Sequence, residues 1–286
     1  MPPIVERDRT ARTRVGKTAL MGIVNVTPDS FSDGGRWLEP EAAIARGIAL
    51  VEAGADVLDV GGESTRPGYV PVPPADQIAR VVPVIEGLRA HVSVPISIDT
   101  THASVARAAL DAGADWINDT TALHDDEAMA DLAAERDAQL VLMHRFEPAR
   151  TAASLPAARE LVRTIARTLA SRVDLAVAHG VTRARCILDP GIGFGTTPID
   201  AVALHVFVDE LAALGLPLLF GPSRKSFLGA VAGCPPGERE FATAASVTLL
   251  ASAGVDYVRV HDVHAMRGPA ALGDAVRELR AREGDS

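Results

Sequence analysis

Short apolar runs and longer amphipathic stretches alternate along this chain about eight times. The apolar runs have the length of buried strands. In the stretches between them, apolar residues recur every three or four positions, as in a helix that packs one face on a sheet. Strands that alternate with helices in this way predict a parallel sheet of βα units. The expected helices span residues 40–53, 75–89, 104–112, 127–135, 157–179, 199–214, 239–253 and 269–281.

A glycine directly after the helix marks five of the expected helix-to-strand turns, because glycine accepts the left-handed conformation common past a helix end. A doubly wound open sheet would give similar local signals. However, the chain has no Gly-x-Gly-x-x-Gly motif after its first strand, and the repeat reaches eight. The pattern therefore predicts an α/β fold, a single (β/α)8 TIM barrel with its active site at the C-terminal ends of the strands. The glycines are Gly54, Gly113, Gly180, Gly215 and Gly254.

The length of 286 residues suits one barrel, for which about 250 residues is typical. We expect residues 1–17 to form a polar N-terminal extension and residues 18–286 to form the catalytic barrel domain. The extension lacks the apolar core of a secretory signal. Two connections, residues 27–36 and 61–74, are long and rich in Gly, Pro and Ser, which predicts binding loops or lids.

Composition and charge argue against several classes of partner. The formal net charge is −9 and aromatic residues make up 4%, so we expect no nucleic-acid surface. No stretch reaches the roughly 18 uninterrupted apolar residues of a membrane span, so we expect no membrane insertion. Cys186 and Cys234 lack metal-ligand spacing and fit a reduced, cytoplasmic protein.

Three apolar runs end in an oxygen-bearing side chain: Asp99 in SIDT, Asn118 in INDT and Asp189 in LDPG. Each residue alone could cap a helix or form a turn. Three at neighbouring strand ends would instead form a ring of hydrogen-bond acceptors with one amide. Such a set suits the adjacent N–H donors of a flat heterocycle such as a pterin or guanine, and Mg²⁺ is the alternative ligand.

Cationic side chains follow the last two strands. Lys225 lies in GPSRK, and Arg259 and His261 share one face of YVRVHD. Any one of them could be a solvated surface charge, but Arg259 and His261 alternate with valines in a strand of buried type. Loops after the last two strands often bind phosphate in barrels, so the set predicts an anionic ligand. Asn25, at the end of the first run, could bind a phosphate oxygen or Mg²⁺.

Three further candidates lie in connections rather than at strand ends. Arg66, in the second long connection, could add a fork of hydrogen-bond donors. Phe31 and Phe194 could cover an aromatic substrate, or they could only anchor their loops on the barrel rim.

Seven motifs in this order make residues 20–279 resemble the dihydropteroate synthase family. Two are long, MGIVNVTPDSFSDGG at residues 21–35 and DVGGESTRPG at residues 59–68, and the others are SIDT, INDT, LDPGIGFG, GPSRKSFLG and VRVHDV. The resemblance implies a barrel that condenses 6-hydroxymethyl-7,8-dihydropterin diphosphate with para-aminobenzoate. It would release pyrophosphate, form 7,8-dihydropteroate and use Mg²⁺ as cofactor.

The resemblance also implies roles for particular residues. Asp99, Lys225 and Arg66 would form the catalytic set, and Asp99 and Lys225 would hold the pterin together with Asn118 and Asp189. Arg66, Arg259, His261 and Asn25 would hold the diphosphate with Mg²⁺, with Asn25 as the metal ligand. Thr65, Pro67, Phe31, Phe194 and Ser223 would surround the aminobenzoate, where sulfonamides would compete. Met143, at the end of the fifth apolar run, belongs to the expected substrate-binding residues.

The chain departs from the family pattern at two places. Thr196 stands where many relatives have Lys, and MHRFEPARTAAS replaces a commoner MHMQGTP-like phrase after the fifth strand. Either change could alter affinity, but neither removes a residue assigned to the core chemistry.

Two other functions fit part of the pattern. A methyltetrahydrofolate methyltransferase would share the pterin-holding residues but would not need Lys225, Arg259 and His261 as a diphosphate cradle. A catalytically silent pterin-binding paralogue would be expected to lose Arg66 or Lys225, and the chain keeps both. The resemblance also implies a homodimer, for which the Ala-rich helix at residues 241–252 is a candidate face.

Overall fold

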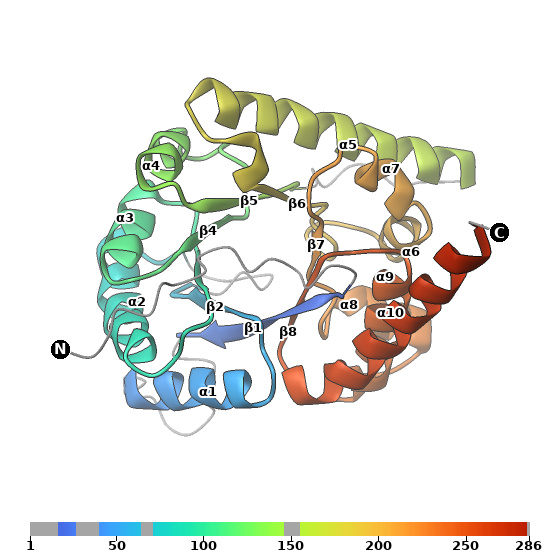
Figure 1. Cartoon of the computed structure of the whole chain (residues 1–286), viewed down its shortest axis with the longest axis horizontal. Helices are drawn as coiled ribbons and strands as arrows, with labels where there is room; N and C mark the ends of the chain where they lie inside the picture. Colours follow the sequence, from blue (N-terminus) through green and yellow to red (C-terminus); the bar gives the residue numbers. More distant parts are fainter. Residues whose placement is uncertain (1–16, 27–39, 64–70, 146–154, 285–286) are drawn as a thin grey trace.

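Eight parallel strands form the centre of the molecule, and helices surround them (Figure 1). The computed structural model describes residues 17–26, 40–63, 71–145 and 155–284. Consecutive strands are neighbours from β1 to β6, and β8 pairs with both β1 and β7. The strands are β1 (Ala19–Asn25), β2 (Val57–Gly61), β3 (Ile96–Asp99), β4 (Trp116–Asp119), β5 (Gln139–Met143), β6 (Cys186–Asp189), β7 (Leu219–Phe220) and β8 (Tyr257–Val260).

A bridge joins the two ends of this sheet. Leu188 of β6 is bridged in parallel to Leu218, which precedes β7, and the Leu188 amide donates to the Pro217 carbonyl at 2.9 Å. The sheet therefore closes on itself, and the predicted (β/α)8 barrel is confirmed. The predicted extension at residues 1–17 lies outside the described residues except for Lys17, so its boundary stays a prediction.

Most expected helices are found within a few residues of their predicted bounds. All five glycines of the expected helix-to-strand turns have positive φ, from 68° at Gly215 to 110° at Gly113, as their sequence position predicts. None of the described helices is long and apolar enough to cross a membrane. The helices are α1 (Pro40–Glu52), α2 (Pro74–Arg89), α3 (Ala103–Asp111), α4 (Ala128–Arg136), α5 (Leu155–Ala178), α6 (Pro198–Val206), α7 (Val208–Ala212), α8 (Ser226–Ala232), α9 (Glu240–Ser252) and α10 (Val263–Gly284).

Three helical features differ from the sequence prediction. The helix expected over residues 199–214 is divided into α6 and α7 at Phe207, whose φ of −113° and ψ of 38° leave the helical path. Helix α8 was not predicted, because its seven residues are too few to show a helical period. The predicted start of the last helix at Pro269 was wrong, since α10 begins at Val263 and contains this proline.

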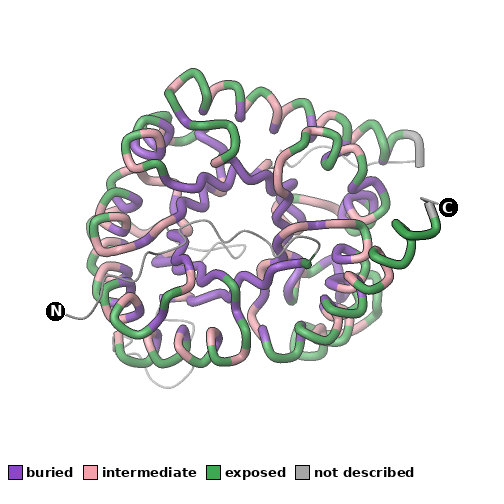
Figure 2. Tube along the Cα trace, viewed as in Figure 1, coloured by how far each residue is buried: buried purple, intermediate pink, exposed green. Residues whose placement is uncertain are grey.

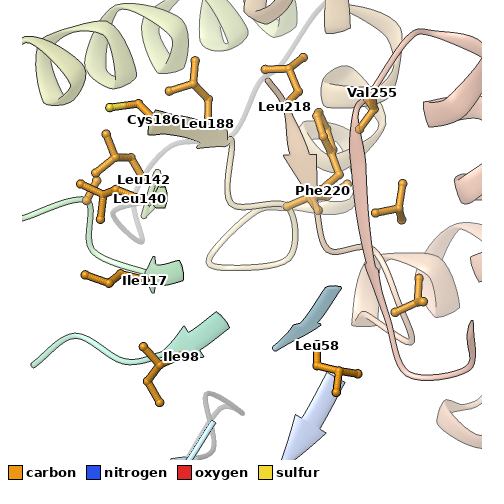
Figure 3. Close-up of a cluster of buried hydrophobic side chains, with 14 of the residues drawn as sticks. Leu58, Ile98, Ile117, Leu140, Leu142, Cys186, Leu188, Leu218, Phe220 and Val255 are labelled. Carbon is orange, nitrogen blue, oxygen red and sulfur yellow. The ribbon is translucent and has the colours of Figure 1, made fainter. Parts of the chain in front are cut away.

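The core has two layers, one on each side of the sheet. The larger layer lies between strands and helices, where buried residues line both (Figure 2), and Figure 3 shows part of it, including Leu58, Ile98 and Phe220. The smaller layer fills the inside of the barrel, where the Trp116 and Tyr257 rings meet edge to face with centroids 5.4 Å apart. Its other members are Ala19, Met21, Val57, Val141, Ile187 and Leu219.

This inner layer fixes which end of the barrel can bind a ligand. Most of its residues lie in the first half of their strands, so they fill the amino-terminal part of the interior. Side chains on one face of a strand recur at every second position. The inward positions near the carboxyl ends therefore remain for polar residues.

Candidate active site

The inward face of the barrel changes from apolar to polar along the strands. On β2, β4, β6 and β8, the inner-core residue is followed two positions later by a charged or amide side chain on the same face. The strand register places Gly61, Asp99 and Asn118 at one level across β2, β3 and β4. The polar inward residues are Asp59, Asn118, Asp189 and Arg259.

Arg259 joins the acids of two other strands. Its Nε donates to Asp59 Oδ2 at 2.6 Å, and its Nη2 donates to Asp99 Oδ2 at 2.8 Å. Asn118 Nδ2 donates to the same Asp59 oxygen at 3.1 Å. The predicted convergence of Asp99, Asn118 and Arg259 is therefore found. The ion pairs were not predicted, because Arg259 was expected to face only a diphosphate.

Sequence reasoning missed Asp59 as a member of this site. Its side chain is fully buried in the middle of β2, within the apolar run VLDVG. A carboxylate in a buried strand needs a buried partner, since an isolated charge is costly to remove from water. The matching base was visible in YVRV as Arg259. Pairing the two buried charges would have found it.

Asp99 does not cap a helix, although that role was an open alternative. The backbone amide that opens α3, Ala103 N–H, donates instead to Asp126 Oδ2 at 2.8 Å. Burial and the nearby Asp59 carboxylate raise the pKa of Asp99 to about 7, although Arg259 and Lys225 oppose the shift. This carboxyl can therefore hold or release a proton near neutral pH.

Asp189 forms a local turn and lies on the inward face of β6. One carboxylate oxygen accepts the Gly191 N–H at 2.7 Å, so the turn-forming alternative is correct for that oxygen. Burial raises the pKa of Asp189 to about 6, and the Gly191 hydrogen bond partly offsets it. A Cβ on Gly191, whose φ is +74°, would lie 1.8 Å from the His144 carbonyl oxygen, so only glycine fits there.

Lys225 is the residue directly before α8, and its side chain lies across the ring of Phe194. Its Nζ lies 3.6 Å from the ring centroid, a cation–π contact. Burial, aided by Arg259, lowers the pKa of Lys225 to about 8, although Asp189 and Asp99 oppose this shift. A Cβ on Gly193 would lie 2.6 Å from Lys225 Cδ, so this glycine leaves space for the lysine chain.

His261 and Ser223 hold each other at the ends of β8 and β7. Ser223 Oγ lies 2.9 Å from His261 Nδ1 and accepts the His261 N–H at 3.2 Å. Arg46 of α1 donates to the His261 carbonyl at 2.6 Å. Ser223 is buried, and its hydroxyl is engaged with His261. Its predicted place beside an aminobenzoate stays a prediction, and the contact to His261 was not foreseen.

The remaining candidates end β1 and β5 or lie outside the described residues. Asn25 ends β1, half-buried and in register with Gly61. Met143 ends β5 in register with Asp189 and is buried. The predicted roles of Phe31, Thr65, Arg66 and Pro67 fall outside the described residues and stay predictions.

A cavity of about 490 Å³ lies beside the site rather than within it. It opens between the connection after β4, the end of β5 and helix α5. Met143 and His144 line it, whereas the cluster around Arg259 does not. Burial lowers the pKa of His144 and so favours the neutral ring.

The predicted metal ligand, Asn25, offers one amide oxygen at the end of β1. Within residues 17–26, 40–63, 71–145 and 155–284, no three His, Cys, Asp or Glu side chains gather as a metal-binding group. Mg²⁺ commonly uses one or two protein oxygens and completes its shell with water and substrate phosphate. The amide oxygen of Asn25 fits such a site.

The arrangement has the chemistry of a site for a flat polar ring and an anion. Asp99, Asn118 and Asp189 offer oxygen acceptors at three strand ends, while Lys225 and Arg259 supply positive charge beside them. The shifted pKa values of Asp99, Asp189 and Lys225 are typical of a functional site.

The chain is similar to known proteins over nearly its whole length. A family model described as "Pterin binding enzyme" matches residues 21–261. The dihydropteroate synthase of Mycobacterium leprae is 46% identical over 253 residues, which cover 86% of this chain and 89% of that relative. Among solved structures, a dihydropteroate synthase from Clostridium difficile, in the presence of pteroic acid, has a TM-score of 0.85 at 38% identity, covering 91% of this chain and 97% of that chain. Another from Xanthomonas albilineans, in complex with 7,8-dihydropteroate, has 0.82 at 39% identity, covering 94% and 95%.

Proposed function

The chain belongs to the pterin binding enzyme family, and we propose that it is a dihydropteroate synthase. It condenses 6-hydroxymethyl-7,8-dihydropterin diphosphate with para-aminobenzoate and releases pyrophosphate. The observation that carries this proposal is the cluster in which Asp59 joins Asn118 and Arg259, and Arg259 holds Asp99, with Lys225 beside it, in a chain whose relatives carry that name.

The pterin ring binds to the acids and amides at the strand ends. Its 2-amino group and ring N–H are adjacent donors, which a carboxylate such as Asp189 can accept in parallel. Asn118 adds an amide oxygen, and Lys225 donates to a ring oxygen or nitrogen. Asp99 faces the reacting end of the ring, where positive charge develops.

The diphosphate lies toward the cations. His261 and Arg259 supply donors at the end of β8, and the predicted contribution of Arg66 belongs to the same part of the proposal. Mg²⁺ would be held through Asn25, substrate oxygens and water, and when bound it would neutralise charge on the departing pyrophosphate. The aminobenzoate lies near Phe194, with Thr65, Pro67, Phe31 and Ser223 as its other predicted contacts.

The reaction exchanges one bond at the methylene carbon for another. The carbon–oxygen bond to pyrophosphate breaks first, because the electron-rich ring stabilises the resulting cation and Asp99 stabilises its charge. The aminobenzoate nitrogen then forms the new carbon–nitrogen bond and loses a proton. The arylamine needs no strong base, since its lone pair is already nucleophilic.

We propose that the protein is a homodimer. Exposed apolar side chains gather on α6, α8, α9 and α10, helices that contact one another along one side of the barrel. Exposed apolar side chains on helices that contact one another are typical of an interaction surface, and a second copy is the partner proposed here. The large exposed apolar residues on these helices are Ile199, Val202, Val206, Val231, Phe241, Leu249, Leu272 and Leu279.

The free thiols of Cys186 and Cys234 fit the cytoplasm, where we place the enzyme.

The direct test measures pyrophosphate release from the purified protein with Mg²⁺, the pterin diphosphate and para-aminobenzoate. Release that requires both substrates is expected, and Asp99→Ala or Lys225→Ala should abolish it. Glu160→Ala, on the exposed face of α5, is the control and should leave the rate unchanged. A sulfonamide should compete with the aminobenzoate. Pterin binding without any pyrophosphate release would contradict the proposal and indicate a silent paralogue.

A further inference from the structure

We infer that Asp59 is a positioning residue that fixes the orientation of both Asn118 and Arg259 toward the pterin substrate. The inference rests on the proposed function, because it assigns a purpose to a buried charge within that site. Asp59 has no part in the reaction as described above, and its carboxylate is fully buried.

Both hydrogen bonds of Asp59 go to residues of the site. Arg259 Nε on β8 lies 2.6 Å from Asp59 Oδ2, and Asn118 Nδ2 on β4 lies 3.1 Å from the same oxygen. The other oxygen, Oδ1, is buried and has no hydrogen-bond partner among the described residues. The carboxylate on β2 therefore ties together two side chains whose strands are not neighbours of each other.

Three aspartates that directly precede strands have a different environment from Asp59. Asp56, Asp115 and Asp256 each precede a strand and accept a backbone N–H from the neighbouring strand or from the residue directly before it, at 2.9, 3.1 and 2.9 Å respectively. These carboxylates satisfy the sheet at the end of the barrel away from the site. Asp59 accepts no backbone N–H from any described residue, so its position serves the side chains above the inner core rather than the sheet.

For Asn118, the contact decides which end of the amide meets the ligand. An asparagine side chain can present either its oxygen or its nitrogen, and the hydrogen-bond network selects one. Because Nδ2 donates to Asp59, the amide oxygen is the atom that is left for a ligand. A pterin edge rich in N–H donors requires this acceptor.

For Arg259, the contact fixes the plane of the guanidinium group. Nε is held by Asp59 and Nη2 by Asp99, so the group is anchored at two points. The guanidinium has five N–H donors in a rigid fork, and those not used by the two acids remain for substrate. Without Asp59 the group would be held by Asp99 alone and could rotate about its chain.

Asp59 also affects the charge of Asp99, which gives a second readout. Asp99 is faced by Asp59 on β2, Glu63 after β2, Arg259 on β8 and Lys225 before α8. Burial raises the pKa of Asp99 most, the two acids add to this shift, and the two bases lower the pKa. Removing the negative charge of Asp59 should therefore make Asp99 ionise at a lower pH.

The experiment compares Asp59→Asn with Asp59→Ala. Since both hydrogen bonds use one oxygen, asparagine can keep both acceptor contacts while it removes the charge and places an amide nitrogen at the position of Oδ1. Binding of 6-hydroxymethyl-7,8-dihydropterin diphosphate is measured by calorimetry with Mg²⁺, and the KM for each substrate is measured by pyrophosphate release. Asp56→Asn is the matched control directly before the same strand, where an aspartate accepts a backbone N–H instead. Thermal unfolding of every variant confirms a folded barrel.

We expect Asp59→Ala to weaken pterin diphosphate binding about 10- to 100-fold while the KM for aminobenzoate changes less than about 2-fold. Asp59→Asn should weaken binding by less and shift the acid limb of the kcat/KM profile to lower pH. Asp56→Asn should change neither property. Unchanged pterin binding in a folded, active Asp59→Ala variant would overturn the inference, as would a pH profile of Asp59→Asn identical to the parent. If the parent itself released no pyrophosphate, the proposed function would fail instead.

Discussion

The Asp189 carboxyl is buried, and burial disfavours its charged form. Its folded-state pKa is about 6, above an ordinary value of 3.8, because it is buried. Below about pH 4 the folded and unfolded chains both hold the proton. As the pH rises toward 6, the unfolded chain releases it first, so the folded state loses stability, and the whole loss is present above about pH 6.

Replacing this group with a neutral isostere should remove that loss. We predict that Asp189→Asn is more stable than the parent by about 1–3 kcal/mol at pH 7.5, because the amide oxygen can still accept the Gly191 N–H. The variant should bind pterin diphosphate poorly. Urea unfolding at pH 7.5 and at pH 4 measures the effect, which should nearly vanish at the lower pH. An equal difference at both values would contradict the assigned charge effect.

Among single residues, the sequence predicted which side chains lie close together better than which hydrogen bonds they form. Asp99, Asn118 and Arg259 were placed together because polar residues ended successive apolar runs, and strand ends of a barrel share one rim. The contacts between Arg259 and the acids, and between Ser223 and His261, depend on which strands are neighbours after closure. For Arg259 that pairing joins β8 to β1 across most of the chain length and leaves no local signal, whereas Ser223 and His261 follow the consecutive strands β7 and β8.

The connection after β4 is an element whose shape depends on one carboxylate. Asp119 Oδ1 accepts the Thr121 N–H and hydroxyl at 2.9 and 2.7 Å, and Oδ2 accepts the Leu123 N–H at 2.6 Å. Leu123 has a φ of 66°, in the left-handed region that non-glycine residues rarely adopt. The hydrogen bonds hold this strained backbone directly after Asn118, so the element positions a site residue.

We predict that Asp119→Ala lowers the free energy of unfolding by about 2–4 kcal/mol, since three buried donors would lose their acceptor. Asp125→Ala, at an exposed position of the same connection, should change it by less than about 0.5 kcal/mol. Urea unfolding provides the energies, and hydrogen exchange of the Leu123 amide should accelerate only in the first variant. A protected Leu123 amide in Asp119→Ala would show that the carboxylate does not hold the loop.

Element bounds were predictable where a local rule applied and not where tertiary contacts intervened. The glycine turns are examples of the first kind, since their left-handed backbone is a property of the residue itself. The start of α10 is an example of the second. A proline often begins a helix because its missing N–H needs no partner there, but Pro269 lies inside α10, which begins at Val263. Burial of Val263 and Met266 extends the helix ahead of the proline.

For the whole molecule, counting βα units was sufficient to predict closure. A closed barrel removes sheet edges, and eight strands leave an interior just wide enough for side chains. The inner core around Trp116 and Tyr257 then fills the amino-terminal half. The same strands form the binding site at the other end, because the inward residue two positions after the inner core is polar on four of them.

On the outer surface, helix α9 exposes large apolar side chains that a monomer would be expected to bury. Phe241 is 89% exposed and Leu249 is 58% exposed, and both belong to the apolar face proposed for a homodimer. A charge on such a face opposes association, since it would be buried without a partner. We predict that Phe241→Glu converts a dimer of about twice 29.9 kDa into a monomer.

Analytical ultracentrifugation at micromolar concentration measures this change. Ala42→Glu, an exposed position on α1, adds the same charge on a helix outside the apolar face and should remain dimeric. Because the site residues lie at the strand ends inside one barrel, the monomeric variant should keep pterin diphosphate binding. A parent that sediments as a monomer would refute the dimer. A monomeric variant that no longer binds pterin would show instead that the partner subunit supports the site.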